Sequence, residues 1–154
     1  MIVPIPPERC AEAGRVWAES WRAANAGTAD PVYLRQQTGE AYARQVLAPH
    51  VEAYAFLEAE AVCGVLRLDT ATGELATLYV APAQQGRGIG GQLLRFGIAR
   101  LRALGLRPWL GVLSTNLRAA AIYAHCGFVP TGEELTLDAT RDIREVRYRW
   151  REEQ

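Results

Sequence analysis

The chain contains no lysine, so all 17 of its basic residues are arginines. Histidine and cysteine are also scarce, with two and three residues. Two histidines are too few for a metal cluster, and three widely spaced cysteines indicate neither a disulfide framework nor a zinc site. No apolar run reaches the roughly 18 residues of a membrane span, and the first residues lack the basic start of a secretory signal. We therefore expect a cytoplasmic protein with no metal and no membrane partner.

The remaining composition is typical of one globular domain. The chain has 154 residues, of which 49% are hydrophobic and 22% charged, so a single domain over residues 1–154 can bury a core of its own. The 17 basic residues balance 17 acidic ones, which gives no indication of a nucleic-acid partner. The acids are unevenly spread, because none lies from Leu75 through Gly132. That stretch contains six arginines and is suited to a polyanionic ligand: Arg87, Arg95, Arg100, Arg102, Arg107 and Arg118.

The most informative stretch joins a strand to a helix through a loop rich in glycine. Leu75 to Val80 mixes β-branched, aromatic and aliphatic residues over the length of a strand, which Ala81-Pro82 ends. Four glycines follow in the six residues from Gly86 to Gly91, and a helical pattern begins there. Glycine lets backbone N–H groups converge on an anion, and a helix N-terminus adds the positive end of its dipole. The stretch therefore predicts a phosphate-binding loop.

Several phosphate-binding patterns can be compared with this loop. Gly86 to Gly91 satisfies G-x-G-x-x-G, but a dinucleotide site also needs an acid about 20 positions further on, at the end of the next strand. The next candidate strand, Arg107 to Leu113, contains no acid. A nucleoside-triphosphate loop needs Gly-Lys-Ser/Thr, which a chain without lysine cannot supply. What remains is Gln-x-x-Gly-x-Gly at Gln85, Gly88 and Gly90, with a glycine-rich turn that binds nothing as the plain alternative.

Strand and helix patterns alternate along the chain. Periodicity and turn residues predict strands at Met1 to Ile5, Val51 to Glu58, Ala61 to Leu68, Leu75 to Val80, Arg107 to Leu113, Glu133 to Leu137 and Ile143 to Trp150. Helices are predicted at Glu8 to Asn25, Leu34 to Leu47, Ile89 to Leu104 and Asn116 to Cys126, with a break from Gly27 to Pro31. The helix from Ile89 places its apolar residues on one broad arc that includes Leu104. Ser114 or Thr115 can cap the helix that follows. The order indicates an α/β domain.

A second motif lies in the run from Asn116 to Phe128. Seven residues advance a helix by two turns less about 20°, so Asn116 and Tyr123 share one stripe of the predicted helix. Gly127 then ends the helix, and Phe128 is the apolar residue beyond it. The two side chains of the stripe therefore face the same partner.

The two motifs together resemble those of the GNAT superfamily of N-acyltransferases. The loop resembles the family's acyl-CoA pyrophosphate loop, and Asn116, Ala119, Tyr123, Gly127 and Phe128 match its second motif. The resemblance spans nearly the whole chain. It implies a mixed, mostly antiparallel central sheet with a splayed parallel strand pair and flanking helices. It also implies transfer of an acetyl group from acetyl-CoA, a cosubstrate, to a primary amine of a small molecule, or of a protein or peptide, by direct attack in a ternary complex.

The resemblance also implies roles for individual residues. Tyr123 would protonate the departing thiolate, and Glu74 lies where some members place a general base. The cofactor would be bound by Leu78, Tyr79 and Val80 at the strand end, by the loop residues Gln85, Gly86, Arg87, Gly88, Ile89 and Gly90, and by Asn116 and Arg118. Each role has a plainer alternative. Tyr123 could be a packing residue with no catalytic role, Asn116 could simply be the residue that begins a helix, and Glu74 could be a solvated carboxylate.

The acceptor stays open at this stage. The family builds its acceptor side from segments that correspond to Trp17 to Leu47 and Thr131 to Asp142, and neither carries a motif that identifies an amine. Trp21, Arg22 and Tyr33 lie where the acceptor site is usually covered, although core packing explains Trp21 equally well. Glu133, Glu134 and Asp138 could favour a cation but are more commonly solvated. A non-catalytic acyl-CoA-binding sensor is the alternative to an enzyme, and we also consider a homodimer formed through the C-terminal strands.

Overall fold

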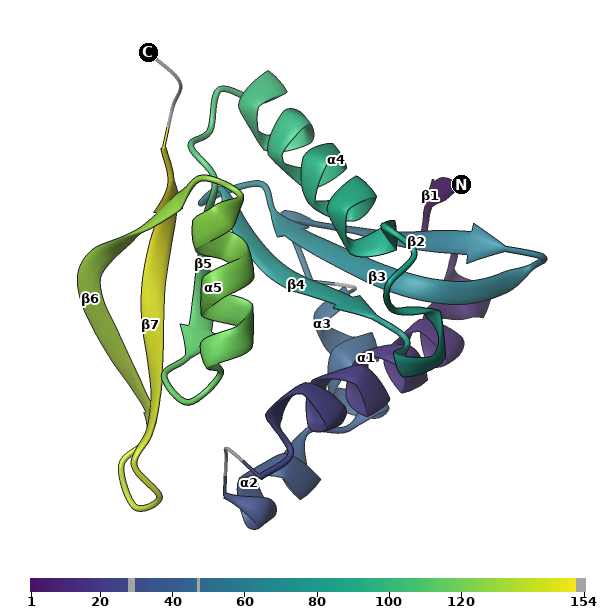
Figure 1. Ribbon diagram of the computed structural model, residues 1–154. Helices are drawn as coiled ribbons and strands as arrows, with labels where there is room; N and C mark the ends of the chain where they lie inside the picture. Colours follow the sequence, from purple (N-terminus) through teal and green to yellow (C-terminus); the bar gives the residue numbers. More distant parts are fainter. Residues whose placement is uncertain (28–29, 47, 152–154) are drawn as a thin grey trace.

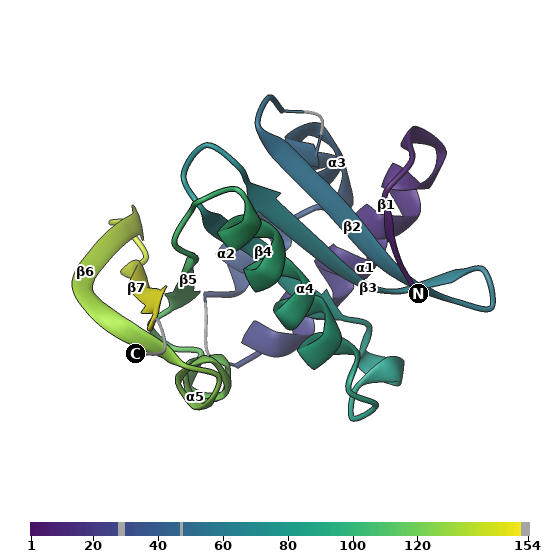
Figure 2. The ribbon, with the colours of Figure 1, turned by 90° about the horizontal axis from the view of Figure 1, so that it is seen from above.

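The computed structural model describes residues 1–27, 30–46 and 48–151. Its seven strands form one sheet in the order β1-β2-β3-β4-β5-β7-β6, with α4 and α5 on one face and α1, α2 and α3 on the other (Figure 1). In Figure 2, α4 lies in front of β3 and β4, and α1 lies behind them. Every pairing between the described strands is antiparallel except that of β4 with β5. The predicted mixed, mostly antiparallel α/β fold is confirmed.

The boundaries of the elements follow the sequence patterns closely. The strands are β1 (Ile2–Pro4), β2 (Val51–Glu58), β3 (Ala61–Asp69), β4 (Glu74–Val80), β5 (Trp109–Leu113), β6 (Phe128–Asp138) and β7 (Ile143–Trp150). The helices are α1 (Cys10–Asn25), α2 (Pro31–Gln36), α3 (Gly39–Val46), α4 (Ile89–Ala103) and α5 (Leu117–His125), with short 3₁₀ turns η1 (Pro7–Arg9) and η2 (Pro82–Gln84). The largest boundary difference is in β6, which begins five residues before the predicted start at Glu133.

The parallel pair β4 and β5 separates almost as soon as it forms. Their register contains one pair, Glu74 with Trp109, at the start of both strands. β4 stays paired with β3 as far as Val80, and β5 stays paired with β7 as far as Leu113. The carboxyl ends of the two strands therefore have no hydrogen bonds to each other, and Figure 1 shows them diverging. The predicted splayed pair is confirmed.

A β-bulge in β4 decides which side chains reach each face of the sheet. Arg67 of β3 pairs with Thr77, but the next residue, Leu68, pairs with Leu75, so Ala76 is an extra residue in β4. Side chains alternate along a strand, and an extra residue shifts that alternation by one. Glu74 consequently lies on the same face as Thr77 and Tyr79, the face that α1 covers. Without the bulge, Glu74 would face α4.

Two apolar clusters fill the two sides of the sheet. On the α4 side, Leu66, Leu68, Leu93 and Leu101 are fully buried. On the other side, Trp17 and Tyr42 stack at 5.3 Å between ring centroids in a cluster of α1, α3 and the sheet, with Ala13, Ala18, Trp21 and Val65. Leu104, which the periodicity places on the apolar arc of α4, is 42% exposed instead. It is the residue after the last turn of α4, where the helical geometry ends.

The prediction of one helix from Leu34 to Leu47 is wrong, because two short helices occupy this region. α2 begins at Pro31, since the Asp30 carboxylate accepts hydrogen bonds from two amides of the first turn. It ends at Gln36, because the next residue, Gln37, is extended with φ −85° and ψ 100°. The Thr38 hydroxyl then accepts a hydrogen bond from the Ala41 amide at 3.2 Å as α3 begins. The predicted break from Gly27 to Pro31 ends in this cap, while Thr28, Ala29 and Leu47 lie outside the described residues.

α1 and α3 approach each other closely at two glycines, which generates a test of the fold. A Cβ added at Gly14 would lie 2.6 Å from the carbonyl oxygen of Gly39. Alanine in place of glycine inside a helix usually stabilises a protein by roughly 0.5–1 kcal/mol. We expect Gly14→Ala to lower the free energy of unfolding by about 1–3 kcal/mol instead, because backbone atoms must move apart. Urea denaturation measures this change.

Gly91→Ala in the first turn of α4 is the matched control. There the added Cβ would meet only the end of the flexible Arg95 side chain, at 3.4 Å. We expect its stability to equal or exceed that of the wild type. A Gly14→Ala variant as stable as the wild type would contradict the close crossing of α1 and α3.

Candidate functional site

The loop between β4 and α4 exposes its backbone. Gly86 and Gly88 have φ of 81° and 80°, in the left-handed region that glycine tolerates best. A Cβ added at either residue would meet no atom within 4 Å. The Gln85 side-chain amide donates a hydrogen bond to the Val80 carbonyl oxygen at 3.3 Å, which ties the loop to the end of β4. The loop therefore presents its backbone to a space that a ligand can enter.

The N-terminus of α4 adds unpaired donors to this loop. The first amides of a helix have no acceptor within the helix, and Gly88, the N-cap residue, has no side chain to bond them. α4 has 15 residues, so its dipole places partial positive charge at this end. The unpaired amides at the N-terminus of α4 and the open space at Gly86 and Gly88 are chemically suited to an anion such as a phosphate group.

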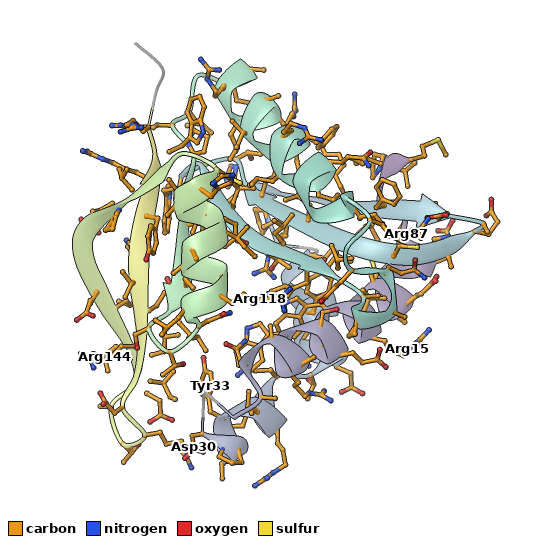
Figure 3. The ribbon with its side chains drawn as sticks, in the orientation of Figure 1. Arg15, Asp30, Tyr33, Arg87, Arg118 and Arg144 are labelled. Atoms are coloured by element: carbon orange, nitrogen blue, oxygen red, sulfur yellow. The ribbon has the colours of Figure 1, made fainter. Side chains whose placement is uncertain are left out.

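The net positive charge around the loop is smaller than the six arginines of the acid-free stretch of sequence indicate. Arg87 forms an ion pair with Glu58 of β2 at 2.5 Å, at the end of the β2–β3 hairpin (Figure 3). Arg100 binds Glu52 of β2 through two hydrogen bonds of 2.9 Å. These guanidinium groups hold the pKa of Glu58 and of Glu52 below the usual value. Both acids lie outside the acid-free stretch of sequence. They reach its arginines because the fold places β2 beside the loop and α4.

Tyr123 lies on α5 beside the divergence of β4 and β5. Its partly buried ring meets the Phe128 ring edge-on at 5.9 Å between centroids. Burial, with a smaller contribution from the Cys126 thiol, raises the pKa of Tyr123 to about 12. Tyr123 in turn contributes to the raised pKa of Tyr79 on β4, after the larger effect of burial. Tyr123 therefore keeps its proton at neutral pH and lies near the end of β4.

Asn116 caps α5, in place of the predicted Ser114 or Thr115. Its buried side-chain oxygen accepts a hydrogen bond from the Ala119 amide at 3.1 Å. Asn116 thus has the plainer of its two expected roles, that of the residue that begins a helix. The amide nitrogen of its side chain takes no part in this cap and can donate to a ligand. Arg118 follows in the first turn of α5 and is exposed (Figure 3). His125 is exposed as well.

Glu74 is the first residue of β4, where β4 and β5 are still paired, and it lies on the face of the sheet that α1 covers. Its carboxyl group is partly buried, and its pKa is raised, first by burial and then by Glu145 of β7. Arg67 opposes this shift without cancelling it. No sequence motif distinguishes Glu145 from the other strand carboxylates, so sequence reasoning missed it. Only the register of β7 against β5 places it here.

α2 and the end of α1 cover this side of the sheet. Trp21 is buried against Trp17 and Tyr33, so packing explains its position. Arg22 donates to the Gln37 carbonyl oxygen and is exposed. Tyr33 projects from α2 toward the sheet (Figure 3), and its pKa is raised by burial and then by Glu145. Of the three predicted covering residues, Tyr33 is the one that faces the divergence.

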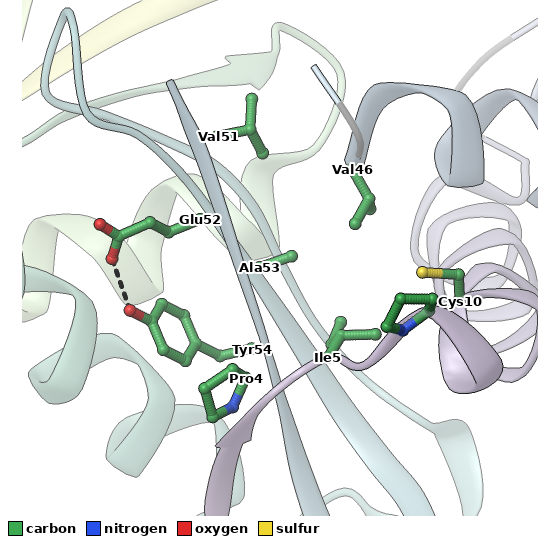
Figure 4. Close-up of a pocket in the computed structure, with 9 residues that line it drawn as sticks. Pro4, Ile5, Cys10, Val46, Val51, Glu52, Ala53 and Tyr54 are labelled. Carbon is green, nitrogen blue, oxygen red and sulfur yellow. Dashed lines mark hydrogen bonds between the residues drawn. The ribbon is translucent and has the colours of Figure 1, made fainter. Parts of the chain in front are cut away.

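A separate hollow lies at the other end of the sheet, against β1 and β2 (Figure 4). Its lining includes Ile5, Val46, Val51 and Tyr54. The only carboxylate in that lining, Glu52, already binds the Tyr54 hydroxyl and Arg100. The charge in this hollow is therefore already paired within the protein.

Two further types of site are not found in the described part of the chain. None of the helices within residues 1–27, 30–46 and 48–151 is long and apolar enough to cross a membrane. No three histidine, cysteine or acidic side chains among the same residues are placed so that they could hold a metal ion.

Comparison with known proteins connects this geometry to a family. The sequence model of the acetyltransferase (GNAT) family matches residues 14–128. Mycothiol acetyltransferase from Beutenbergia cavernae is 48% identical over 63 residues, which are 40% of this chain and 21% of that protein. The chain thus spans about a fifth of the length of this curated relative.

Solved structures share the fold at low sequence identity. PaiA N-acetyltransferase from Thermoplasma acidophilum, in complex with coenzyme A, has a TM-score of 0.76 and 19% identity over 97% of this chain and 98% of that one. The apo form of YjaB from Escherichia coli has a TM-score of 0.78 and 18% identity over 97% and 96% of the two chains. At this identity the likeness shows the fold alone.

The glycine loop leads to a binding prediction. We expect Gly88→Val to lower the affinity for coenzyme A at least tenfold while the protein stays folded. A branched side chain would fill the space beside the helix N-terminus and disfavour the left-handed backbone. Calorimetric titration with coenzyme A measures the affinity, and circular dichroism checks the fold.

Gly105→Val is the matched control, at the other end of α4. Gly105 has φ of 76°, and a Cβ added there would also meet no atom within 4 Å. The substitution imposes the same backbone strain without touching the loop, so coenzyme A affinity should stay at the wild-type value. Equal affinities in the two variants would show that the loop does not hold the phosphates.

Proposed function

This chain belongs to the acetyltransferase (GNAT) family, and we propose that it transfers an acetyl group from acetyl-CoA to a primary amine of a small molecule or a peptide. One observation carries the proposal. The carboxyl ends of β4 and β5 diverge beside an open glycine loop and the protonated Tyr123, and Glu74, whose pKa is raised, begins β4 on the face of the sheet that α1 covers. The coenzyme A complex of PaiA and the acetyltransferase name of the Beutenbergia relative support it.

Backbone groups would do most of the cofactor binding. The amides of Gln85 to Gly90 would bind the pyrophosphate, with Arg118 nearby for the outer phosphates. Leu78 to Val80 pair with β3 on one edge only, so the N–H and C=O groups of the other edge are free to bond the amides of the pantetheine arm. The side-chain nitrogen of Asn116 would donate to the same arm. The side chain of Arg87 stays with Glu58 and contributes through its backbone.

Acetyl-CoA supplies the thioester carbonyl that the acceptor amine attacks. The amine nitrogen forms a bond to the acetyl carbon, and the bond between that carbon and sulfur breaks. Glu74 takes the proton that the amine loses, directly or through water, and Tyr123 gives its phenolic proton to the departing thiolate. Backbone N–H groups at the end of β4 can stabilise the negative charge that develops on the carbonyl oxygen. The products are the N-acetylated amine and coenzyme A, and solvent restores both protonation states.

Removal of the Tyr123 hydroxyl tests catalysis separately from binding. We expect Tyr123→Phe to lower kcat about 10²-fold, the low end of the range for positioned acid catalysis, because a thiolate is already a fairly good leaving group. Affinity for coenzyme A should change little, since the ring and its contact with Phe128 remain. Thiol release in a screen of amines, amino acids and peptides gives the rate.

Tyr148→Phe is the control, since Tyr148 packs on the same apolar cluster from β7. Its kcat should equal that of the wild type. An unchanged kcat for Tyr123→Phe, under conditions where chemistry limits turnover, would remove Tyr123 from the mechanism. Coenzyme A binding with no thiol release for any amine would favour the non-catalytic binder.

The raised pKa of Glu74 predicts the pH dependence of the reaction. A base works only when ionised, so kcat/KM should fall as the pH drops through the pKa of Glu74, which lies above the usual 4.5 of a glutamate. Glu74→Gln should lower kcat/KM about 10²- to 10⁴-fold and abolish this acidic limb. Rates measured across pH test both effects. A variant that keeps the wild-type rate and the same limb would show that another group is the base.

A further inference from the structure

The position of Glu145 on β7 depends on a glycine in the neighbouring strand. Glu145 pairs with Leu113 of β5, and its side chain lies across Gly111, on the face that α1 and α2 cover. A Cβ added at Gly111 would lie 2.0 Å from Oε1 of Glu145. Any other residue at position 111 would therefore displace the carboxylate. The glycine gives Glu145 its place beside the edge of β5 from which β4 diverges.

Arg147, the cation near Glu145, and Arg67, the cation near Glu74, both contact other groups as well. Arg147, two residues along β7 on the same face, stacks on the Trp109 ring at 4.7 Å and lies 3.5 Å from the Glu133 carboxylate. Arg67 of β3 lies over the Tyr42 ring at 5.7 Å. Within the described part of the chain, no ion pair includes Glu145. Burial raises the pKa of Glu145, and Arg147 opposes that shift only in part.

Three elements place polar groups around this carboxylate. Glu74 of β4 and Tyr33 of α2 are both near enough for Glu145 to raise their pKa values. α2 is held in this position because Asp30, its N-cap residue, forms an ion pair of 3.4 Å with Arg141 in the β6–β7 turn. Arg141 also binds Asp138, the last residue of β6, at 3.0 Å. Two partly buried carboxylates and a phenol thus surround the acceptor side of the diverging strands.

We propose that Glu145 is the residue that selects the acceptor, and that the acceptor is a small molecule with at least two amino groups. One amine would be acetylated near Glu74, and a second, still protonated, would bind the Glu145 carboxylate. This inference rests on the proposed acetyl transfer and names its substrate class. Two partly buried carboxylates that Arg67 and Arg147 offset only in part disfavour each other's ionised form, and a bound ammonium group relieves that cost. A partly buried position strengthens the attraction relative to water.

The test compares 1,4-diaminobutane with butylamine, which lacks the second amine. With coenzyme A bound, wild-type protein should bind the diamine at least tenfold more tightly in calorimetric titrations, and kcat/KM should show the same preference. Glu145→Gln keeps the shape of the side chain and removes its charge. Its affinity and its kcat/KM for the diamine should therefore fall to the values for butylamine. The loss should appear in Kd and KM for the diamine, while coenzyme A affinity stays unchanged. The acidic limb of the rate should move to lower pH for both amines, because Glu145 contributes to the raised pKa of Glu74.

Two further variants make the test specific. Glu134→Gln removes the same charge from the opposite face of the sheet, where Glu134 pairs with Arg144 at 3.5 Å, and should change nothing. Gly111→Ala keeps the charge but displaces the carboxylate, so it should lose the diamine preference as Glu145→Gln does. Circular dichroism confirms that each variant is folded.

Binding and turnover separate this inference from the proposed function. Wild-type protein that binds the two amines equally, or a Glu145→Gln or Gly111→Ala variant that keeps the diamine preference, would overturn the role of Glu145. Diamine binding that depends on Glu145 but releases no thiol would support the role of Glu145 as a binding residue and contradict acetyl transfer.

Discussion

The structure depends on an interruption in the hydrogen bonding of its central sheet. A parallel pair usually bonds along its whole length, but β4 and β5 share one register pair and then diverge. The interruption is tolerated because each strand keeps an antiparallel partner on its outer edge, β3 for β4 and β7 for β5. Their inner edges retain N–H and C=O groups without a partner strand, and such groups are costly unless water or a ligand bonds them. An extended, amide-bearing ligand arm meets that requirement.

The same interruption separates two chemical environments. On the α4 side, the loop and helix N-terminus offer backbone donors, and Tyr123 approaches from α5 with its proton retained. On the α1 side, the bulge at Ala76 places Glu74 on the face that α1 covers, and Glu145 lies over Gly111 on the same face. A cofactor bound on one side and an amine bound on the other would meet at the end of β4. Tyr123 and Glu74, the two titratable side chains of the proposed reaction, thus lie on opposite faces of the sheet (Figure 1).

Local patterns predicted the parts of this site that lie close together in the sequence. The strand, loop and helix from Glu74 to Ala103 and the stripe from Asn116 to Tyr123 depend on residues within a few turns of each other. Sequence reasoning failed where distant strands meet. Glu58 and Glu52 neutralise Arg87 and Arg100 only because β2 folds against the loop and α4. Glu145 and the bulge depend on strand register, and the division between α2 and α3 depends on the caps at Asp30 and Thr38.

The central claim is that acyl-CoA binds between the diverging strands, and amide NMR tests it most directly. Isotope-labelled protein would be titrated with acetyl-CoA while the backbone amide signals are followed. We expect the signals of Leu78 to Val80 and of Gly86 to Gly90 to shift together, and those of Val51 to Tyr54, beside the hollow at β1 and β2, to stay in place. Shifts confined to Val51 to Tyr54, with none at the end of β4, would contradict the account.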